Sequence, residues 1–221
     1  MKLLSINLAR SIWLGPMIDF NPKGLYLYPS VISLLVGTYK FKKVPSPSDV
    51  LDLTKGVAFE NGEFRIDEKA SVVIHVTIYN DGVVATASSS TEHADAFLLD
   101  AFSLFSTKLG LPDHKQILKR KVYASQLFVS TNRSLELLNP KLAQISKYLS
   151  NNVEEGDKTF QVGGVHLWPD QIIGKNNPPP FTFERAAGAP FSDKRYFSSA
   201  PLPTHKHLEL LEQIEAILSR R

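Results

Sequence analysis

Cysteine is absent from this chain of 221 residues, and so are the short motifs of several common enzyme classes. Without cysteine there is no disulfide, no thiolate nucleophile and no cysteine-ligated metal, and the composition fits a reducing cytoplasm. The phosphate-binding patterns G-x-x-x-x-G-K-[ST] and G-x-G-x-x-G are missing, as are G-x-S-x-G and H-E-x-x-H. These absences weigh against the common nucleotide enzymes, serine hydrolases and zinc proteases.

A long apolar run is missing as well. The longest uncharged stretch near the start, residues 24–39, is short for a membrane span and contains Pro29. Arg10 interrupts the segment that would form the apolar core of a signal peptide. We therefore expect a soluble cytoplasmic protein with neither an export signal nor a transmembrane helix.

The chain has little excess charge of either sign, because 25 basic and 22 acidic residues give a net charge of only +3. Residues 1–56 are more basic than the remainder, and they are also rich in aromatics and proline. The apolar and charged fractions are those of an ordinary globular protein that buries a substantial core. We expect a single domain of residues 1–221, with residues 1–56 as part of it or as an N-terminal extension or subdomain.

The clearest local pattern begins with a hairpin in residues 71–87. Apolar residues alternate along residues 71–79 with the period of a half-buried strand, and Asn80-Asp81-Gly82 supplies a turn. With Asp81-Gly82 as the two-residue turn, Ile78 lies opposite Ala85 and Val76 opposite Ala87. The small residues on the returning strand would let a helix approach the sheet closely.

A long amphipathic helix follows the hairpin, over residues 90–109. A capping box at residues 89–92 predicts its start, and Gly110 followed by Pro112 predicts its end. Leu99 lies off the apolar face, which is common for a single leucine. Six residues form that face at helical spacing: Ala94, Phe97, Leu98, Ala101, Leu104 and Phe105.

The remaining patterns are shorter, and they alternate between strand and helix signals. They predict a helix from Pro29, a brief helix through Leu53, two short strands around a turn at 60–62, a strand at 121–130, a helix at 139–149, strands at 159–168 and 181–186, an irregular loop to Pro203 and a helix at 204–220. Tight turns between neighbouring strands favour antiparallel pairing. We therefore expect an α+β fold with a largely antiparallel sheet and helices packed on one face.

Two groups of polar residues suggest catalysis or metal binding. His166, Asp170 and Glu184 lie near strand ends, and imidazole with carboxylate can bind a divalent ion or transfer protons. The alternative for His166 is a packing role beside an aromatic residue. His205 and His207 point about 200° apart on a helix, so they cannot share a metal, and we expect His207 to pack and His205 to be exposed. We expect no metal site and no cofactor.

The segment from Phe181 to Pro203 favours protein binding, because aromatic and arginine side chains are enriched at interfaces. Its candidate contact residues are Arg185, Phe191, Arg195, Tyr196 and Phe197. The alternative is a long loop held in place by its own aromatics. Our leading hypothesis is a non-enzymatic protein-binding or assembly module, as a homo-oligomer or with another protein, and a metal-assisted or acid–base hydrolase-like enzyme is the alternative.

The densest basic run suggests a second alternative, weak nucleic-acid binding. Lys115, Lys119, Arg120 and Lys121 could contact phosphates, because charge supplies most of the affinity for nucleic acid of any sequence. The run lacks the aromatics that stack on bases. A solvated helix end leading into a strand explains it better, so we expect nucleic acid to be an unlikely partner.

Overall fold

The computed structural model describes residues 1–24, 27–46, 54–153, 159–170 and 177–219. Its strands are β1 (Lys2–Leu14), β2 (Val57–Arg65), β3 (Ser71–Tyr79), β4 (Gly82–Ala87), β5 (Arg120–Ser130), β6 (Gly164–Leu167), β7 (Phe181–Arg185) and β8 (Arg195–Ala200). Its helices are α1 (Tyr28–Tyr39), α2 (Thr91–Leu109), α3 (His114–Ile117), α4 (Leu142–Asn152) and α5 (Thr204–Ser219), with 3-10 turns η1 (Met17–Phe20), η3 (Leu135–Leu138) and η4 (Phe191–Asp193).

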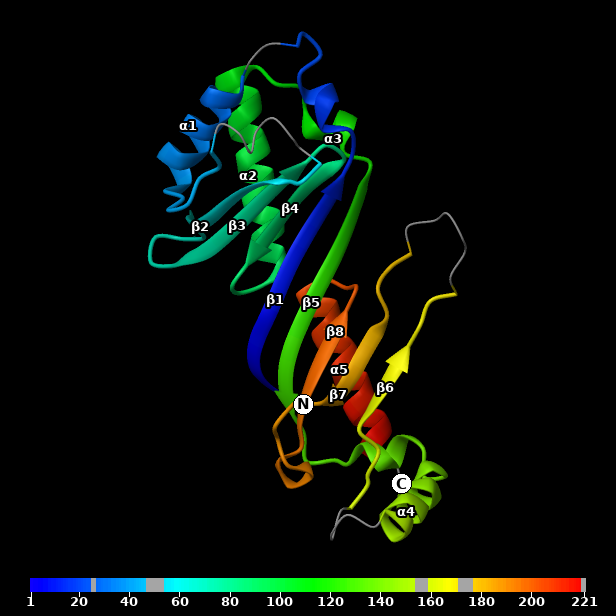
Figure 1. The fold of residues 1–221 in the computed structure, drawn as a ribbon. Helices are drawn as coiled ribbons and strands as arrows, with labels where there is room; N and C mark the ends of the chain where they lie inside the picture. The colour runs from blue at the N-terminus through cyan, green and yellow to red at the C-terminus, as the bar shows by residue number, and fades with distance from the viewer. Residues whose placement is uncertain (25–26, 47–53, 154–158, 171–176, 220–221) are drawn as a thin grey trace. The chain divides into compact units, whose positions relative to one another are not determined.

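The strands form an antiparallel sheet in the order β2-β3-β4-β1-β5-β8-β7-β6 (Figure 1). With the helices, this arrangement confirms the predicted α+β fold. The brief helix expected to end at Leu53 and the expected last residue of the C-terminal helix, Arg220, lie outside the described residues.

The chain divides into two compact units. Unit 1 contains Met1–Asn7, Gln126–Pro201 and His205–Arg221, and unit 2 contains Leu8–Ser125 and Leu202–Thr204. β1 and β5 contribute residues to both units. The single domain of residues 1–221 stays a prediction.

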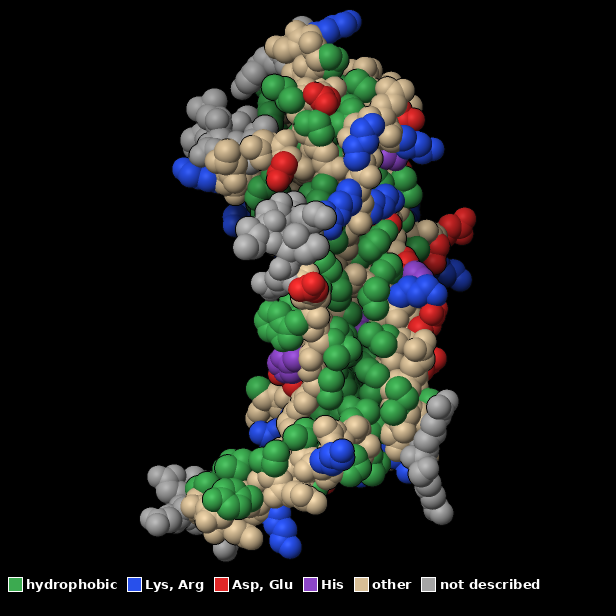
Figure 2. Space-filling model, turned by 90° about the vertical axis from the view of Figure 1, so that its right-hand side faces the viewer, with side chains coloured by type: hydrophobic (Ala, Val, Ile, Leu, Met, Phe, Trp, Pro, Cys, Tyr) green, Lys and Arg blue, Asp and Glu red, His purple; other side chains and the backbone are tan. Residues whose placement is uncertain are grey.

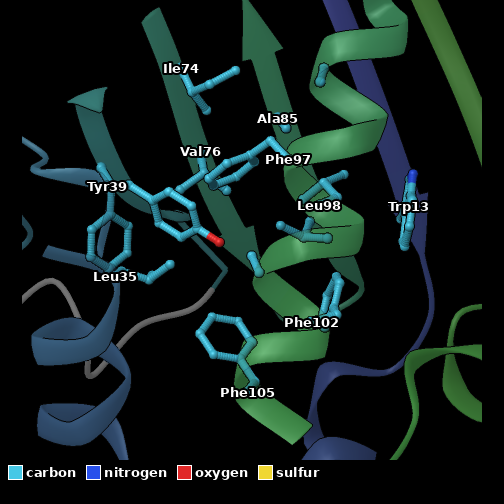
Figure 3. Close-up of a cluster of buried hydrophobic side chains, with 14 of the residues drawn as sticks. Trp13, Leu35, Tyr39, Ile74, Val76, Ala85, Phe97, Leu98, Phe102 and Phe105 are labelled. Carbon is cyan, nitrogen blue, oxygen red and sulfur yellow. The ribbon is translucent and has the colours of Figure 1, made fainter. Parts of the chain in front are cut away.

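The core of unit 2 forms between α2 and the hairpin of β3 and β4 (Figure 3). Val76 and Ala85 face Phe97 and Leu98 of α2, and all four side chains are buried. The small Ala85 lets the helix lie close to the sheet, as the sequence predicts. α1 adds Leu35 and Tyr39 to the same core.

The register of the β3–β4 hairpin differs from the prediction. Asn80 and Asp81 form the turn, so Val76 lies opposite Ala85 and Ile78 opposite Val83. The predicted pairs were wrong by two residues, which leaves every side chain on its expected face. Gly82 is the first residue of β4 and lies beside β1. A Cβ atom at this position would lie 2.5 Å from the carbonyl oxygen of Trp13, so the close approach of the two strands requires glycine.

Substituting Gly82 tests this close approach. We expect Gly82→Ala to lower the free energy of unfolding by roughly 1–3 kcal/mol, because backbone atoms must move to admit the methyl group. Urea unfolding measures the change. The matched control is Gly37→Ala in α1, where a Cβ atom meets nothing within 4 Å, so this variant should be at least as stable as the wild type. Equal stability of the two variants would contradict the packing argument.

The start of α2 also differs by one residue from the prediction. The capping residue is Ser90, whose Oγ accepts a hydrogen bond of 3.2 Å from the amide of His93. Ser89 instead contacts the His93 ring, with 2.7 Å between Oγ and Nδ1. The expected end is confirmed, because Gly110 adopts a left-handed conformation with φ +65°.

The sequence patterns missed β1 and β8. Small and polar residues occupy the inward positions of both strands, Ser11 between Ala9 and Trp13 on β1 and Ser198 between Tyr196 and Ala200 on β8. An apolar alternation was therefore hard to recognise. The irregular loop expected up to Pro203 is wrong, since it contains η4 and β8.

β2 and β6 correct two further strand predictions. β2 is one continuous strand with a bulge between Phe59 and Gly62, where Asn61 has φ +56°, in place of two strands around a turn. A bulge accommodates an extra residue without ending the ladder, which explains the turn-like sequence. β6 covers only four residues of the strand expected at 159–168.

The core of unit 1 forms where α5 packs on β7 and β8. His207 is fully buried and its Nε2 lies 2.8 Å from Oγ of Ser198, which donates to the carbonyl of Thr182 at 2.9 Å. The ring of Phe181 meets the imidazole edge-on. The structure confirms the packing role of His207 and the exposure of His205.

Candidate functional site

The residues proposed for catalysis come together only in part. His166 on β6 and Glu184 on β7 contact each other with 3.2 Å between Nε2 and Oε2, and nearly half of each side chain is exposed. Asp170 is exposed beyond the end of β6. Within the described residues, no group of three His, Asp or Glu side chains is placed to hold a metal ion. The geometry is that of a polar contact on the surface, and the enzyme hypothesis stays a prediction.

The side chains proposed for protein binding make contacts within unit 1, and two of them, Arg185 and Phe191, contact each other. The Arg185 guanidinium lies 4.3 Å from the centroid of the Phe191 ring, and the exposed Arg195 lies 3.9 Å from Asp193. Tyr196 is buried against Phe183 and is therefore a core residue rather than a contact residue.

Phe197 lies on the other side of β8 from Tyr196. Its ring packs on Phe128 of β5, with 5.4 Å between the ring centroids. Phe197 is partly exposed, and it remains a candidate together with Arg185, Phe191 and Arg195.

Lys119 and Lys121 of the basic run make contacts within the chain. Lys121 lies 3.8 Å from the centroid of the Trp13 ring and 3.5 Å from the Asp95 carboxylate. Lys119 donates to the carbonyl of Gln116. The Asp95 carboxylate offsets the charge of Lys121, and nucleic-acid binding stays a prediction.

Asp95 of α2 gathers donors from two strands of unit 2. It accepts hydrogen bonds from Ser11, from Trp13 Nε1 at 2.8 Å and from the Tyr123 hydroxyl at 2.8 Å. Burial, followed by the hydrogen bond to Asp95, raises the pKa of Tyr123 to about 12. The hydroxyl therefore remains protonated at neutral pH and serves as a donor. The network anchors α2 to β1 and β5.

An open hollow of about 370 Å³ lies beside the C-terminal end of α1 in unit 2. Its lining includes two basic and two acidic side chains, so it has no net charge to attract an ion of either sign. The residues around it are Thr38, Tyr39, Lys40, Glu63, Phe64, Arg65 and Asp100. The Tyr39 hydroxyl donates to Asp100 at 2.7 Å, which closes one side of the hollow.

α4 of unit 1 carries its large apolar side chains on the exposed side. Leu142, Ile145 and Leu149 recur at the spacing of one helical face, and Tyr148 lies beside them. All four are exposed, Ile145 to 56% and Tyr148 to 67%. Hydrophobic side chains gather in Figure 2 at the height at which Figure 1 places α4.

The neighbouring stripe of α4, about 100° around the helix from the apolar one, consists of small residues. Ala143, Ser146 and Ser150 have the same spacing and are only partly exposed. Ser150 Oγ accepts a hydrogen bond of 2.8 Å from the backbone amide of Phe160, which ties this side to the rest of unit 1. No residue of α4 is buried. The helix therefore packs through its small residues and presents its large ones.

This surface was absent from the sequence-based candidates. The pattern of Leu142, Ile145 and Leu149 is visible in the sequence, but the same spacing is typical of a helix face that packs on a core. The sequence signal that distinguishes the two is the parallel stripe of Ala143, Ser146 and Ser150, which offers a second face for close packing.

The fold and this surface define an α+β protein with an exposed amphipathic helix on a two-unit antiparallel scaffold. No helix among the described residues is long and apolar enough to cross a membrane. No protein-family model matches the chain, and a search of curated proteins found no match either.

Proposed function

We propose that this chain is a non-enzymatic protein-binding module of the cytoplasm whose α4 helix inserts into an apolar groove of another protein. The observation that carries the proposal is the exposed stripe of Leu142, Ile145 and Leu149 on a helix that packs through alanine and serine. Insertion of an amphipathic helix into a groove is a recurring mode of recognition. The absence of cysteine in the sequence supports the cytoplasmic location.

The energetics favour a partner for this face. Full burial of an exposed leucine or isoleucine side chain contributes about 1.5–3 kcal/mol. On α4, 37% of Leu142, 56% of Ile145 and 40% of Leu149 are still exposed and available for burial. An isolated helix of this length is marginal in water, but α4 is held in place by unit 1. Less conformational entropy is therefore lost on binding, and micromolar affinity is within reach after the cost of association.

The charge of α4 indicates what surrounds the groove. The helix and its N-cap contain Lys141 and Lys147 and no acidic residue. At 100° per residue, Lys141 lies beside the apolar stripe and Lys147 lies on the polar side. A lysine at a helix N-terminus is unfavourable for the helix dipole. An acidic side chain of the partner near Lys141 would relieve this repulsion, so we expect a groove with an acidic rim.

A protein groove explains α4 better than an anionic membrane surface. Recognition of anionic lipid uses clusters of 4–8 basic residues, each contributing on the order of 1 kcal/mol. Only one lysine borders the apolar stripe of α4. Vesicles with about one third phosphatidylserine are therefore included in the test, and we expect no binding to them.

The test is the double substitution Ile145→Ser and Leu149→Ser. The partner is identified by cross-linking to the wild-type chain, purified, and titrated against both proteins by calorimetry. We expect roughly 100-fold weaker binding by the variant, from about 3 kcal/mol of lost burial. The melting temperature should fall far less than that of a core variant, because 56% of Ile145 and 40% of Leu149 are exposed in the free protein.

The matched control is Gln144→Ser with Asn151→Ser, on the polar side of α4, which should bind as the wild type does. Equal affinity of the Ile145/Leu149 variant and the wild type would contradict the proposal. Wild-type binding to the vesicles that disappears in this variant would assign the surface to a membrane instead. If the melting temperature of the Ile145/Leu149 variant falls as far as that of a core variant, these two side chains stabilise the fold rather than bind a partner.

A further inference from the structure

β6 is the last strand in the sheet order, and its backbone indicates which groups face the open edge. The amide of Arg185 donates to the carbonyl of Gly163 at 2.7 Å, in the same register that pairs Val165 with Phe183. In an antiparallel ladder the N–H and C=O groups of alternate residues point to opposite sides. Val165 and Leu167 therefore bond to β7, while the groups of Gly164 and His166 point to the open edge.

Among the residues that the structure describes, the edge formed by β2 is protected in ways that the edge formed by β6 is not. Along β2, Lys43 pairs with Glu60 through backbone hydrogen bonds, and the bulge at Asn61 interrupts the ladder. Bulges and covering segments are common devices against unwanted strand pairing. β6 has no bulge and no lysine among Gly164–Leu167, and the exposed Leu167 and Trp168 lie at its end.

We propose that β6 pairs with β6 of a second copy of this chain, in antiparallel register with His166 opposite the partner's His166. A two-fold axis perpendicular to the sheet generates this register and keeps each face of one sheet continuous with the same face of the other. The outward groups of Gly164 and His166 then meet those of the partner, and Trp168 extends the ladder by one residue. The inference does not depend on α4.

The sequence of β6 is complementary to itself in this register. Val165 lies opposite the partner's Leu167, so apolar side chains meet on the face that carries Phe181 and Phe183. Trp168 lies opposite the partner's Gly164, which has no side chain, so the indole can cover its backbone. Of the large exposed side chains, Leu167 at 60% and Trp168 at 66% are the two that become covered.

The size of the contact sets the expected strength. A pair of strands of four to five residues buries less than the ~1,200 Å² of a stable interface. We therefore expect a weak dimer, with a dissociation constant on the order of 10⁻⁵–10⁻⁴ M. Sedimentation equilibrium of the full chain over a concentration series measures this constant directly.

His166→Pro separates edge pairing from side-chain effects. Proline removes the outward N–H of residue 166 and leaves the bonds of Val165 and Leu167 to β7 in place. We expect the dimer to weaken at least tenfold. The matched control is His166→Ala, which removes the same side chain and its contact with Glu184 but keeps the N–H, and it should dimerise as the wild type does. Leu167→Lys, a second variant at an exposed position, should also weaken the dimer at least tenfold.

Two readouts locate the contact. Trp168 fluorescence should shift to shorter wavelength as the wild-type concentration rises, since the other tryptophan, Trp13, is already buried. Hydrogen exchange at the amide of His166 should slow with concentration, while that of Val165 should stay constant. A monomer at every concentration overturns the inference, and so does a dimer that His166→Pro and Leu167→Lys leave intact. The Ile145/Leu149 variant should still dimerise, so failure here and failure of the α4 proposal are distinguishable.

Discussion

Replacement of Asp95 by alanine is expected to lower the free energy of unfolding by roughly 2–4 kcal/mol. The substitution removes the acceptor that serves Ser11, Trp13 and Tyr123. Ser11 and Trp13 are fully buried, so water cannot replace the carboxylate for them without local opening. An unsatisfied buried donor costs more than a hydrogen bond contributes, and the Ser11 hydroxyl becomes one, while Trp13 Nε1 keeps Ser11 Oγ as an acceptor at 3.0 Å.

Urea unfolding of the Asp95 variant is best followed by Trp13 fluorescence, because Trp13 lies in the network itself. Asp95→Asn keeps a carbonyl acceptor and should recover part of the loss. Asp100→Ala, on the same helix, removes a single hydrogen bond from Tyr39 and should cost only about 1 kcal/mol. A loss for Asp95→Ala no larger than that for Asp100→Ala would show that the network does not anchor α2.

Acidification is expected to destabilise the protein through His207. Burial lowers the pKa of His207 to about 4 in the folded chain, against about 6.5 in an unfolded chain. The stabilisation is complete above pH 6.5 and is lost as the pH falls towards 4, because the unfolded chain then binds a proton that the folded chain excludes. The difference corresponds to about 3 kcal/mol over this window.

His207→Gln removes the titrating group and should flatten the dependence of stability on pH between 6.5 and 4. The comparison uses urea unfolding of both proteins at several pH values, followed by circular dichroism. His205→Gln, two residues away and exposed, is the matched control and should keep the wild-type slope. Parallel slopes for the wild type and His207→Gln would contradict the assignment of the acid sensitivity to this histidine.

The elements predicted best from the sequence are those in which apolar residues recur with a single regular spacing. The alternation in residues 71–79 and the face of α2 through Phe97 and Phe105 are strong because one side of each element is buried. β1 and β8 escaped prediction because Ser11 and Ser198 occupy inward positions that usually hold apolar residues. Their burial depends on long-range partners, Asp95 and His207, which no local pattern reveals.

The candidate surface was less predictable than the fold. The helix at α4 was expected, but a periodic pattern does not say which stripe faces the protein. The aromatic and arginine residues that the sequence emphasised partly contact one another, as Arg185 does with Phe191. Tyr196 turned inward because β8 placed it on the buried face. Which residues remain outside was therefore decided by tertiary packing.

Photo-cross-linking from α4 tests the partner-binding account most directly. A photoreactive side chain replaces Ile145 in one protein and Asn151 in a second, both at exposed positions but on different sides of the helix. The account predicts that Ile145 yields one cross-linked protein whose contacted groove has an acidic rim, and that Asn151 yields none. Equal cross-linking from the two positions, or cross-linking to lipid alone, would contradict it.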